Sequence, residues 1–360
     1  MAEQRTLPAP QEINKIACLM LNGIGDILCV TPTLEALKER YPEARITMMI
    51  RQHLRALVEG SPFVDELIFY DTSTLWKRLV FLRKIRKQRF DLWVDLHVPT
   101  FNTVSSNERD FFRNAMLMRA SGSTYQLAYA VPQLKPYLSH PVPIPQGEKL
   151  TKVNIVDTTL ALINPEPDRR YLKHIPVSEV ERAWAENILP PTERPRIALF
   201  FGSRQSANIW PDKNILEFIS LLLEEIPEAE LVLIGGEHEA RSAQMMTSSL
   251  SEQSQSRVQN LICKASLGQT AALLKRCQAM VSTDSGPMHI ADAVAVPIVA
   301  LFTSKNYLAI WRPIGNKAVL VNHEVDCGPC FQADCHLGNK CMALITPREV
   351  LDALLHALKN

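Results

Sequence analysis

The chain has 360 residues, of which 46% are hydrophobic and 21% charged, an ordinary globular composition that excludes an extended disordered protein. Its formal net charge of +1 excludes a protein whose main task is to coat nucleic acid. The length predicts two domains. Since no apolar run reaches the roughly 18 residues of a membrane span, and polar residues 1–12 resemble a flexible tail rather than a secretory signal, we predict a cytoplasmic protein.

The first half of the chain predicts alternating strands and helices. A continuous apolar run at residues 15–21 ends at Asn22-Gly23, as expected for a parallel strand that is covered on both faces. Helical spacing and further β-rich runs then alternate, which favours a parallel sheet. The predicted strands cover residues 15–21, 45–50, 66–70 and 92–96, and the predicted helices between them cover residues 27–40 and 74–89.

Two irregular segments separate this series from a second one. Residues 132–145 contain five prolines and residues 164–176 lack periodicity, so neither is predicted to form core structure. We place the interdomain linker at residues 190–195, where prolines and charges precede a new buried strand. The predicted domains cover residues 13–189 and 190–345, with a C-terminal helical segment at 346–360. Strands of the second series are predicted at residues 196–201, 230–234, 279–282 and 298–302, and a last helix at 348–359.

A glycine turn follows the first predicted strand and opens the first helix. Its sequence is GIGD, residues 23–26, and the backbone amides of such a turn favour an anionic ligand. The dinucleotide fingerprint requires a third glycine and an acidic residue after the second strand, where this chain has Leu28 and Arg51. A nicotinamide enzyme is therefore disfavoured. Two interpretations of Asp26 stay open: a helix cap, or a carboxylate that accepts a proton.

A similar turn follows a strand in the second half, with the sequence TDSGPMH at residues 283–289. Its free amides, with Ser285, Gly286 and His289, could hold a pyrophosphate. A capped helix with a hydrogen-bonded histidine is the alternative, and the α/β pattern disfavours the aspartic proteases, which also contain Asp-Ser-Gly. Because ligands bind beyond the carboxyl ends of parallel strands, we expect this turn to converge with the loop after Phe201 and the turn at residues 235–239.

The order of these motifs resembles the bacterial ADP-heptose:lipopolysaccharide heptosyltransferases, glycosyltransferase family 9. The resemblance runs from about Lys15 to Leu358 and includes four motifs: Gly25-Asp26 with Thr31-Pro32, Trp210-Pro211, Gly235-Gly236, and residues 284–289. It implies a GT-B fold, with two doubly wound Rossmann-like domains that face each other across a cleft. It also implies an inverting transfer of heptose from ADP-heptose to a lipopolysaccharide core acceptor, without a catalytic metal. The first domain would bind the acceptor and the second the nucleotide sugar.

The resemblance also implies roles for individual residues. Asp26 would be the general base, in an acceptor loop that includes Gly23 and Gly25. Where the family has a lysine before the aromatic-proline pair, this chain has Asn208, so we expect Arg204, or else Lys213, to supply positive charge to the diphosphate. The implied nucleotide-sugar site, in which Glu237 or Glu239 would contact the ribose, comprises Ser203, Arg204, Asn208, Glu237, Glu239, Asp284, Ser285, Gly286 and His289.

Other functions stay open at this point. A protein acceptor is conceivable within the same family. A nucleotide-binding module without turnover would be consistent with the missing lysine, although it would leave Asp26 without a purpose. An NADP-dependent reductase is disfavoured, because the chain lacks the third glycine and a Tyr-x-x-x-Lys pair.

Four of the eight cysteines lie close together near the C-terminus. Cys327, Cys330, Cys335 and Cys341 could hold a structural Zn or Fe ion, and a similar segment occurs in part of the family resembled, which implies a structural role. Local disulfides are the alternative, which a reducing compartment disfavours. The others are predicted to be buried thiols: Cys18, Cys29, Cys263 and Cys277.

The predicted helix at residues 74–89 is amphipathic and strongly basic. A crossover helix with a solvated face is one interpretation. Contact with anionic lipid or a phosphorylated glycolipid acceptor is the other, which would make the protein peripheral to the inner membrane. Its basic residues are Lys77, Arg78, Arg83, Lys84, Arg86, Lys87 and Arg89, and they lie among Trp76, Leu79, Phe81, Leu82 and Ile85.

Overall fold

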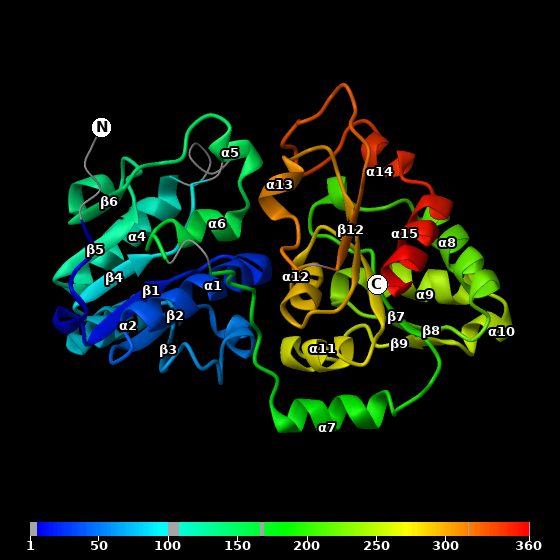
Figure 1. Cartoon of the computed structure of the whole chain (residues 1–360), viewed down its shortest axis with the longest axis horizontal. Helices are drawn as coiled ribbons and strands as arrows, with labels where there is room; N and C mark the ends of the chain where they lie inside the picture. Colours follow the sequence, from blue (N-terminus) through cyan, green and yellow to red (C-terminus); the bar gives the residue numbers. More distant parts are fainter. Residues whose placement is uncertain (1–5, 100–107, 166–168, 316, 360) are drawn as a thin grey trace. The chain divides into compact units, whose positions relative to one another are not determined.

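The computed structural model describes residues 6–99, 108–165, 169–315 and 317–359. The chain divides into two compact units, Met1–Pro176 and Val177–Asn360. Each unit contains one six-stranded sheet whose neighbouring strands run parallel (Figure 1). The predicted α/β class and two-domain GT-B architecture are therefore confirmed.

The first sheet has the strand order β3-β2-β1-β4-β5-β6. The chain begins in the middle at β1, continues to β2 and β3 on one side, and then returns to β4 on the other side. The point between β1 and β4 is thus the topological switch point, where ligands bind in sheets of this kind. The strands are β1 (Lys15–Leu19), β2 (Arg45–Ile50), β3 (Glu66–Phe69), β4 (Leu92–Asp95), β5 (Tyr125–Tyr129) and β6 (His140–Val142).

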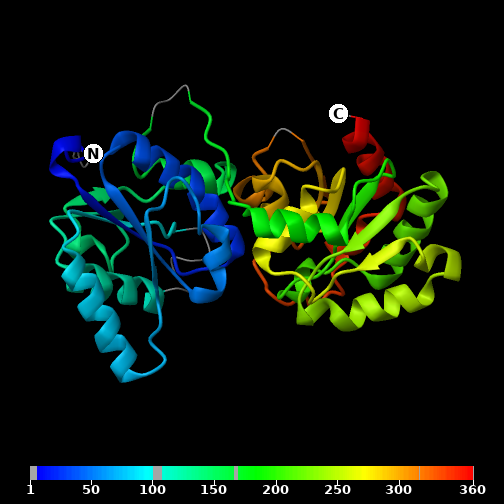
Figure 2. The ribbon, with the colours of Figure 1, turned by 90° about the horizontal axis from the view of Figure 1, so that it is seen from below.

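Helices pack on this sheet as its apolar residues require. Ala17 and Leu19 of β1 share a hydrophobic core with residues of α2 and α4, whereas α1 packs against α6. Figure 2 shows the same unit from below, in blue to green. The helices of the unit are α1 (Ile24–Arg40), α2 (Leu75–Gln88), α4 (Glu108–Ser121), α5 (Lys149–Lys152) and α6 (Ile155–Leu160), with 3₁₀ turns η1 (Pro10–Glu12), η2 (Gln52–Leu57) and η3 (Lys135–Tyr137).

Helix α1 begins earlier than predicted and contains a proline. It starts at Ile24, directly after the glycine turn, and continues through Pro32. Proline lacks an N–H for the carbonyl of Leu28, four residues earlier. The hydroxyl of Thr31 donates to that carbonyl instead, at 2.8 Å. The Thr31-Pro32 pair therefore keeps the helix hydrogen-bonded.

The second sheet has the order β12-β11-β10-β7-β8-β9, so its switch point lies between β7 and β10. Its strands are β7 (Arg196–Phe200), β8 (Glu230–Leu233), β9 (Val258–Asn260), β10 (Ala279–Thr283), β11 (Ile298–Phe302) and β12 (Ala318–Asn322). The helices are α7 (Glu179–Ile188), α8 (Asp212–Glu225), α9 (Glu237–Ser249), α10 (Glu252–Gln255), α11 (Leu267–Leu274), α12 (Gly286–Ala293), α13 (Leu308–Trp311), α14 (Lys340–Leu344) and α15 (Pro347–Lys359), with the 3₁₀ turn η4 (Ser206–Asn208).

Trp210, the aromatic residue of one family motif, is a structural residue of this core. Its side chain is fully buried and contacts the rings of Phe201 and Phe218. The indole N–H donates to the carbonyl oxygen of Ile345 at 3.0 Å. The motif thus ties the start of α8 to the segment before α15.

Several predictions about the fold need correction. The proline-rich segment does contribute core structure, because β6 lies within it and places Pro141 at the sheet edge, where a missing N–H is tolerated. The unit division lies between Pro176 and Val177, ahead of the predicted linker, because α7 packs against α11 of the second unit. The N-terminal segment includes η1, and Tyr41 donates to the carbonyl oxygen of Pro8, while residues 1–5 lie outside the described residues.

Three of the four scattered cysteines are buried, as predicted, and one is not. Cys18, Cys29 and Cys277 lie within the fold, and burial raises the pKa of Cys277 to about 12. Cys263 is exposed, because it follows the short strand β9 in a turn where its own φ is 60°.

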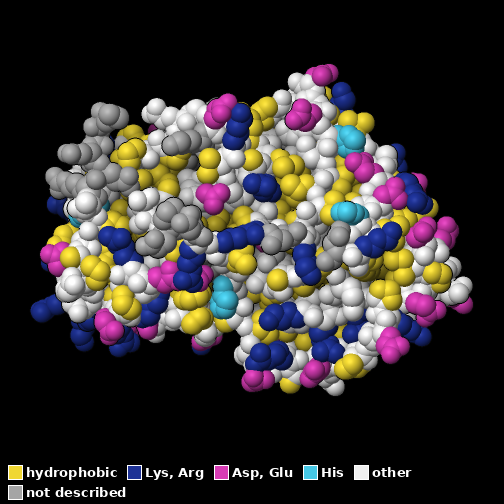
Figure 3. All heavy atoms as spheres, in the orientation of Figure 1, with side chains coloured by type: hydrophobic (Ala, Val, Ile, Leu, Met, Phe, Trp, Pro, Cys, Tyr) yellow, Lys and Arg dark blue, Asp and Glu magenta, His cyan; other side chains and the backbone are white. Residues whose placement is uncertain are grey.

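No helix in the described parts of the chain has the length and apolarity to cross a bilayer. The face drawn in Figure 3 mixes basic and acidic side chains.

Candidate functional site

In the first unit the candidate site is the turn that connects β1 to α1, at the switch point of the sheet. Leu21, in this connection, has both of its backbone polar groups held by side chains. Its N–H donates to Nε2 of His97 at 3.1 Å, and its carbonyl oxygen accepts from Nε of Arg51 at 2.8 Å. Arg51 follows β2 and His97 follows β4, so residues after the two neighbouring strands fix the start of the turn.

Asp26 is held within this turn and remains partly accessible. Its Oδ2 accepts the backbone N–H of Gly23 at 3.1 Å, and its Oδ1 lies 3.4 Å from the side-chain nitrogen of Asn22. Burial raises the pKa of Asp26, although these hydrogen bonds oppose the change. Asp26 therefore caps the helix and is also a carboxylate with increased basicity. Gly23 precedes α1 and Gly25 lies in its first turn, so neither position has a side chain that would cover the backbone there.

His97 belongs to this site, although the sequence analysis did not identify it. Since its Nε2 accepts the Leu21 N–H, the ring proton lies on Nδ1, which is 2.5 Å from Oδ1 of Asp95. His97 is 5% exposed and Asp95 is fully buried. Among the described residues, Oδ2 of Asp95 has no hydrogen-bond partner. The available signal was the position of Asp95 and His97 at the end of a buried parallel strand, because ligands bind beyond the carboxyl ends of such strands.

In the second unit, the loops after β7 and β10 meet at the switch point. The hydroxyl of Thr283 donates to the carbonyl oxygen of Gly202 at 2.8 Å. The amide nitrogen of Asn208 donates to the carbonyl oxygen of Asp284 at 3.0 Å. The side-chain oxygen of Asn208 is buried and has no hydrogen-bond partner among the described residues. Asn208, where the family's lysine is expected, thus joins the two loops.

The predicted pyrophosphate turn begins helix α12. Ser285 is the residue before the helix, and its hydroxyl donates to the carbonyl oxygen of Thr283 at 3.0 Å. The amides that follow, beginning at Gly286, open the helix and favour an anion. His289 is 3% exposed, and its ring lies edge-on to that of Trp311 at 6.2 Å. His289 is therefore a packed residue of this helix, and its position leaves Ser285 and Gly286 nearer the solvent.

The turn after β8 lies beside the same loops. Ser203 and Glu239 both line a cavity of about 80 Å³, whose other lining residues are Gly202, the polar Asp212, His238 and Ser242, and apolar side chains. Oε2 of Glu239 accepts the N–H of Gly236 at 2.8 Å, which orients the carboxylate at the start of α9. Glu237 is exposed and does not line this cavity. The structure thus brings Glu239, rather than Glu237, to the loop after β7.

The two cations expected from the sequence, Arg204 and Lys213, are both exposed. A third cation, Lys305, is 4% exposed and follows β11, the strand beside β10. Its ammonium group donates to the side-chain oxygen of Gln205, in the loop after β7. Burial lowers the pKa of Lys305, and the negative charge of Asp284 opposes that change. Lys305 is therefore a buried amine beside the Asp284 turn, and it was not predicted from the sequence.

The cysteine-rich segment, residues 327–341, packs over the loops of this site. The N–H of Phe331 donates to the carbonyl oxygen of Lys305 at 2.9 Å, and the N–H of Ala207 donates to that of Ala333 at 3.1 Å. A β-carbon at Gly328 would lie 2.6 Å from the carbonyl oxygen of Ser304. The segment therefore holds the loops after β7 and β11 through its backbone.

The predicted metal site at these cysteines is not supported. Cys327, Cys330, Cys335 and Cys341 are free thiols, and the described residues contain no group of three or more His, Cys, Asp or Glu side chains that could hold a metal ion. Cys341 packs against the hydrophobic core through α14. The sulfur of Cys335 accepts the N–H of Leu337 at 3.4 Å. Among these thiols, Cys341 is thus partly buried against the core, whereas Cys335 takes part in a local turn.

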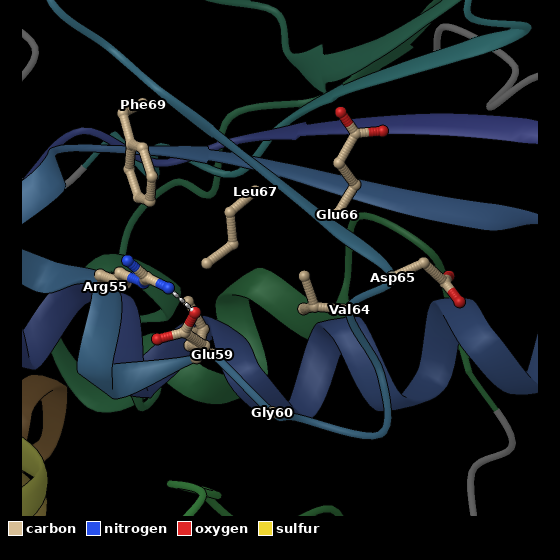
Figure 4. Close-up of a pocket in the computed structure, with 9 residues that line it drawn as sticks. Arg55, Glu59, Gly60, Val64, Asp65, Glu66, Leu67 and Phe69 are labelled. Atoms are coloured by element: carbon tan, nitrogen blue, oxygen red, sulfur yellow. Dashed lines mark hydrogen bonds and ion pairs between the residues drawn. The ribbon is translucent and has the colours of Figure 1, made fainter.

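A larger cavity, of about 320 Å³, lies elsewhere in the first unit (Figure 4). It is formed by η2 and the edge strand β3, and contains the ion pair between Arg55 and Glu59. Neither Asp26 nor His97 lines it. Its volume alone therefore does not make it the candidate site.

Comparisons with known proteins agree with this arrangement. The chain is 25% identical over 358 residues to lipopolysaccharide heptosyltransferase 2 of Salmonella typhimurium strain LT2, covering 96% of this chain and 98% of that protein. The fold is similar to that of Escherichia coli ADP-heptose lps heptosyltransferase II, with a TM-score of 0.78, 23% identity, and coverage of 96% of this chain and 98% of that one. It is also similar to a glycosyl transferase family 9 protein from Veillonella parvula, with a TM-score of 0.80, 20% identity, and coverage of 97% and 98%.

The match to a family model identifies the class of protein. Residues 144–341, more than half of the chain, match glycosyltransferase family 9 (heptosyltransferase). This region contains the strands β7 to β12 and the loops that meet at their switch point. The protein is therefore a glycosyltransferase that belongs to family 9, the heptosyltransferase family.

Proposed function

We propose that this enzyme transfers heptose from ADP-heptose to a lipopolysaccharide core acceptor, with inversion at the anomeric carbon and with Asp26 as the general base. Family membership and the name of the Salmonella relative support heptose as the sugar and lipopolysaccharide as the acceptor class. The observation that carries the mechanism is the position of Asp26, a partly accessible carboxylate of raised pKa at the switch point of its sheet.

The proposed reaction is a single displacement. The acceptor hydroxyl oxygen forms a bond to the anomeric carbon as its proton passes to the Asp26 carboxylate. The bond from the anomeric carbon to the diphosphate oxygen breaks, and ADP leaves with the electron pair. A positioned base contributes about 10²- to 10⁴-fold to such a step, and a raised pKa favours proton acceptance near neutral pH.

The loops of the second unit are suited to the donor. The backbone amides at the start of α12 would bind the diphosphate, together with Ser285 and Gly286. Glu239 would contact the ribose from the cavity that it shares with Ser203. Lys305 would neutralise the diphosphate, because a buried ammonium group interacts with a developing charge more strongly than exposed Arg204 can. The proposal requires no catalytic metal.

Turnover of ADP-heptose tests this proposal. Wild-type enzyme with a lipopolysaccharide core acceptor is expected to release ADP and to form a glycoside of inverted configuration, whereas Asp26→Asn is expected to bind ADP normally and to turn over at least about 100-fold more slowly. Asp71→Asn, at an exposed carboxylate of the same unit, is the matched control. ADP binding without transfer to any acceptor would support a binding module instead, and transfer only to protein would reject the lipopolysaccharide acceptor.

A further inference from the structure

Helix α2 presents apolar side chains to solvent at its free end. Leu75 is 72% exposed, Trp76 is 67% exposed, and Leu79 and Val80 are 42% and 47% exposed. These four residues lie within the first six of the helix. In Figure 2 the helix, in light blue, extends away from the sheet of its unit. Soluble proteins rarely leave such a cluster uncovered without a binding role.

The cluster occupies one side of the helix. With 3.6 residues per turn, the four side chains fall within an arc of about 140°. Phe81 and Ile85 lie on the other side, where they are buried in the core that α2 shares with α4 and the sheet. The packed face thus anchors the second half of the helix, and the apolar cluster is free to contact another surface.

Basic residues continue the same side of the helix beyond the apolar cluster. Arg83 and Lys87 fall within the same arc as the cluster, Lys84 lies next to it, and all three are exposed. Arg83 is seven residues after Trp76, which corresponds to about 10 Å along the axis. Helix α2 contains no acidic residue, and Asp71, just before it, is paired with Lys77 at 2.6 Å. The exposed side therefore has an apolar tip and, about 10 Å behind it, a basic collar.

We propose that α2 is a docking element for an anionic lipid bilayer. The apolar tip (Leu75, Trp76, Leu79 and Val80) enters the interface between headgroups and acyl chains, and the basic collar (Arg83, Lys84 and Lys87) contacts the anionic headgroups. If the helix enters with its N-terminal end first, the tip reaches the boundary between headgroups and acyl chains, about 5–10 Å deep, while the collar, about 10 Å behind along the axis, stays at the headgroups. Tryptophan is enriched at this depth, and each basic residue near an anionic surface adds to the attraction.

A bilayer fits these observations better than a second protein. An apolar protein interface would place the basic collar against a surface from which its charges must be desolvated or paired. An anionic bilayer suits both the apolar tip and the basic collar. Its apolar region begins only about 5–10 Å below its charged surface, so one helix can reach both. The arrangement needs neither donor nor acceptor, so the inference does not depend on the proposed function.

Vesicle flotation at low salt tests the inference. Wild-type protein is expected to bind vesicles of phosphatidylglycerol and phosphatidylcholine, to bind pure phosphatidylcholine vesicles weakly, and to be released by high salt. The tip variant Trp76→Ser/Leu79→Ser and the collar variant Arg83→Gln/Lys84→Gln/Lys87→Gln are each expected to lower the partition coefficient by about tenfold or more. The controls are Val180→Ser, at a 79% exposed valine, and Lys264→Gln/Lys275→Gln/Lys359→Gln, which removes the same charge from the second unit.

Quenching of tryptophan fluorescence by brominated lipid locates the inserted side chain. Of the other four tryptophans, Trp93 and Trp210 are fully buried, whereas Trp184 and Trp311 are partly exposed. Only a quenched signal that disappears in Trp76→Ser therefore assigns insertion to the tip. Absence of wild-type binding at low salt, or equal binding by all variants, would overturn the inference. So would a concentration-dependent dimer in solution that Trp76→Ser abolishes, since the tip would then be a protein interface. Tip variants are expected to retain wild-type turnover with a soluble acceptor fragment.

Discussion

Nε2 of His97 accepts the backbone N–H of Leu21 at 3.1 Å, while Arg51 donates to the carbonyl oxygen of the same residue at 2.8 Å. The peptide groups of Leu21 are therefore fixed by residues that follow β4 and β2. Because Leu21 immediately precedes the turn that contains Asp26, the position of the proposed base depends on this contact. In nicotinamide enzymes an acidic residue after the second strand binds the ribose, whereas Arg51 here has a structural task.

Replacement of His97 by alanine is expected to lower kcat more than it affects ADP binding. The change leaves the Leu21 N–H and the buried Asp95 carboxylate without this partner, which costs roughly 1–3 kcal/mol for each group and lowers the Tm. His97→Gln, whose amide oxygen can accept the Leu21 N–H, should recover part of kcat. His53→Ala, at an exposed histidine, is the control. An unchanged kcat in folded His97→Ala would remove the positioning role.

Asp26→Asn is expected to raise the Tm at pH 7.5 while it lowers turnover. Burial raises the pKa of Asp26, so the folded protein binds more protons than the unfolded chain as the pH rises from the ordinary aspartate pKa of about 3.9 to the raised value. The free energy of unfolding therefore decreases between these two pKa values, and the loss stays constant at higher pH. The difference in Tm between variant and wild type should therefore disappear near pH 3.5.

At Asp71 the effect of ionisation on stability is expected to have the opposite sign. The hydrogen bonds that Lys77 and Ser73 donate hold the pKa of that exposed carboxyl down, to about 2. Its ionised form is thus favoured in the folded protein, and Asp71→Asn should leave the Tm at pH 7.5 unchanged or slightly lower. Thermal scans from pH 3.5 to 7.5 compare the two variants. Equal responses at both sites would contradict the assignment of a raised pKa to Asp26.

Lys305→Met is expected to weaken ADP binding by about 10- to 100-fold, because one charge-assisted hydrogen bond to the diphosphate is lost. Binding of adenosine, which has no phosphate, should change little. Methionine fills a similar volume in this buried position, and Lys305→Arg should retain part of the affinity. Arg204→Ala is the direct comparison, because the sequence alone assigns the diphosphate charge to Arg204. Calorimetry with ADP and with adenosine measures each variant. A larger loss in Arg204→Ala would return the role to Arg204.

Gly202→Ala is expected to raise the KM for the donor. A β-carbon at this position would lie 2.2 Å from Oε1 and Cγ of Glu239, so the carboxylate must move away from the cavity. Gly236→Ala is a matched control in the same region, because its β-carbon would lie 3.7 Å from Oε2 of Glu239, an ordinary contact. Steady-state kinetics with varied donor concentration measures both. Equal KM values would show that Glu239 does not contact the donor.

The sequence by itself determined the central strands and the turns at their carboxyl ends. The predicted bounds of β2 and β11 agree with the structure, and those of β4 and β7 differ by one residue. Central parallel strands are covered on both faces, so they require continuous apolar runs that are visible without an alignment. Shorter or more mixed strands do not all show such runs. The edge strand β3 was predicted, whereas β5, which lies inside the first sheet, was not, and neither were the edge strands β6, β9 and β12. Strand β6 contains Pro141, which a sheet tolerates at its edge.

The tertiary structure alone decided which loops meet. Strand order places His97 beside the Asp26 turn and Lys305 beside the Asp284 turn, although 71 and 21 positions separate the paired numbers in the sequence. Local composition carries no record of that order, because each crossover helix can return the chain to either side of the sheet. The same limit applies to the cysteines, whose spacing indicated a metal site, although the described residues contain no group of side chains that could hold one. Spacing along a chain restricts which residues can meet, and packing determines which of them do.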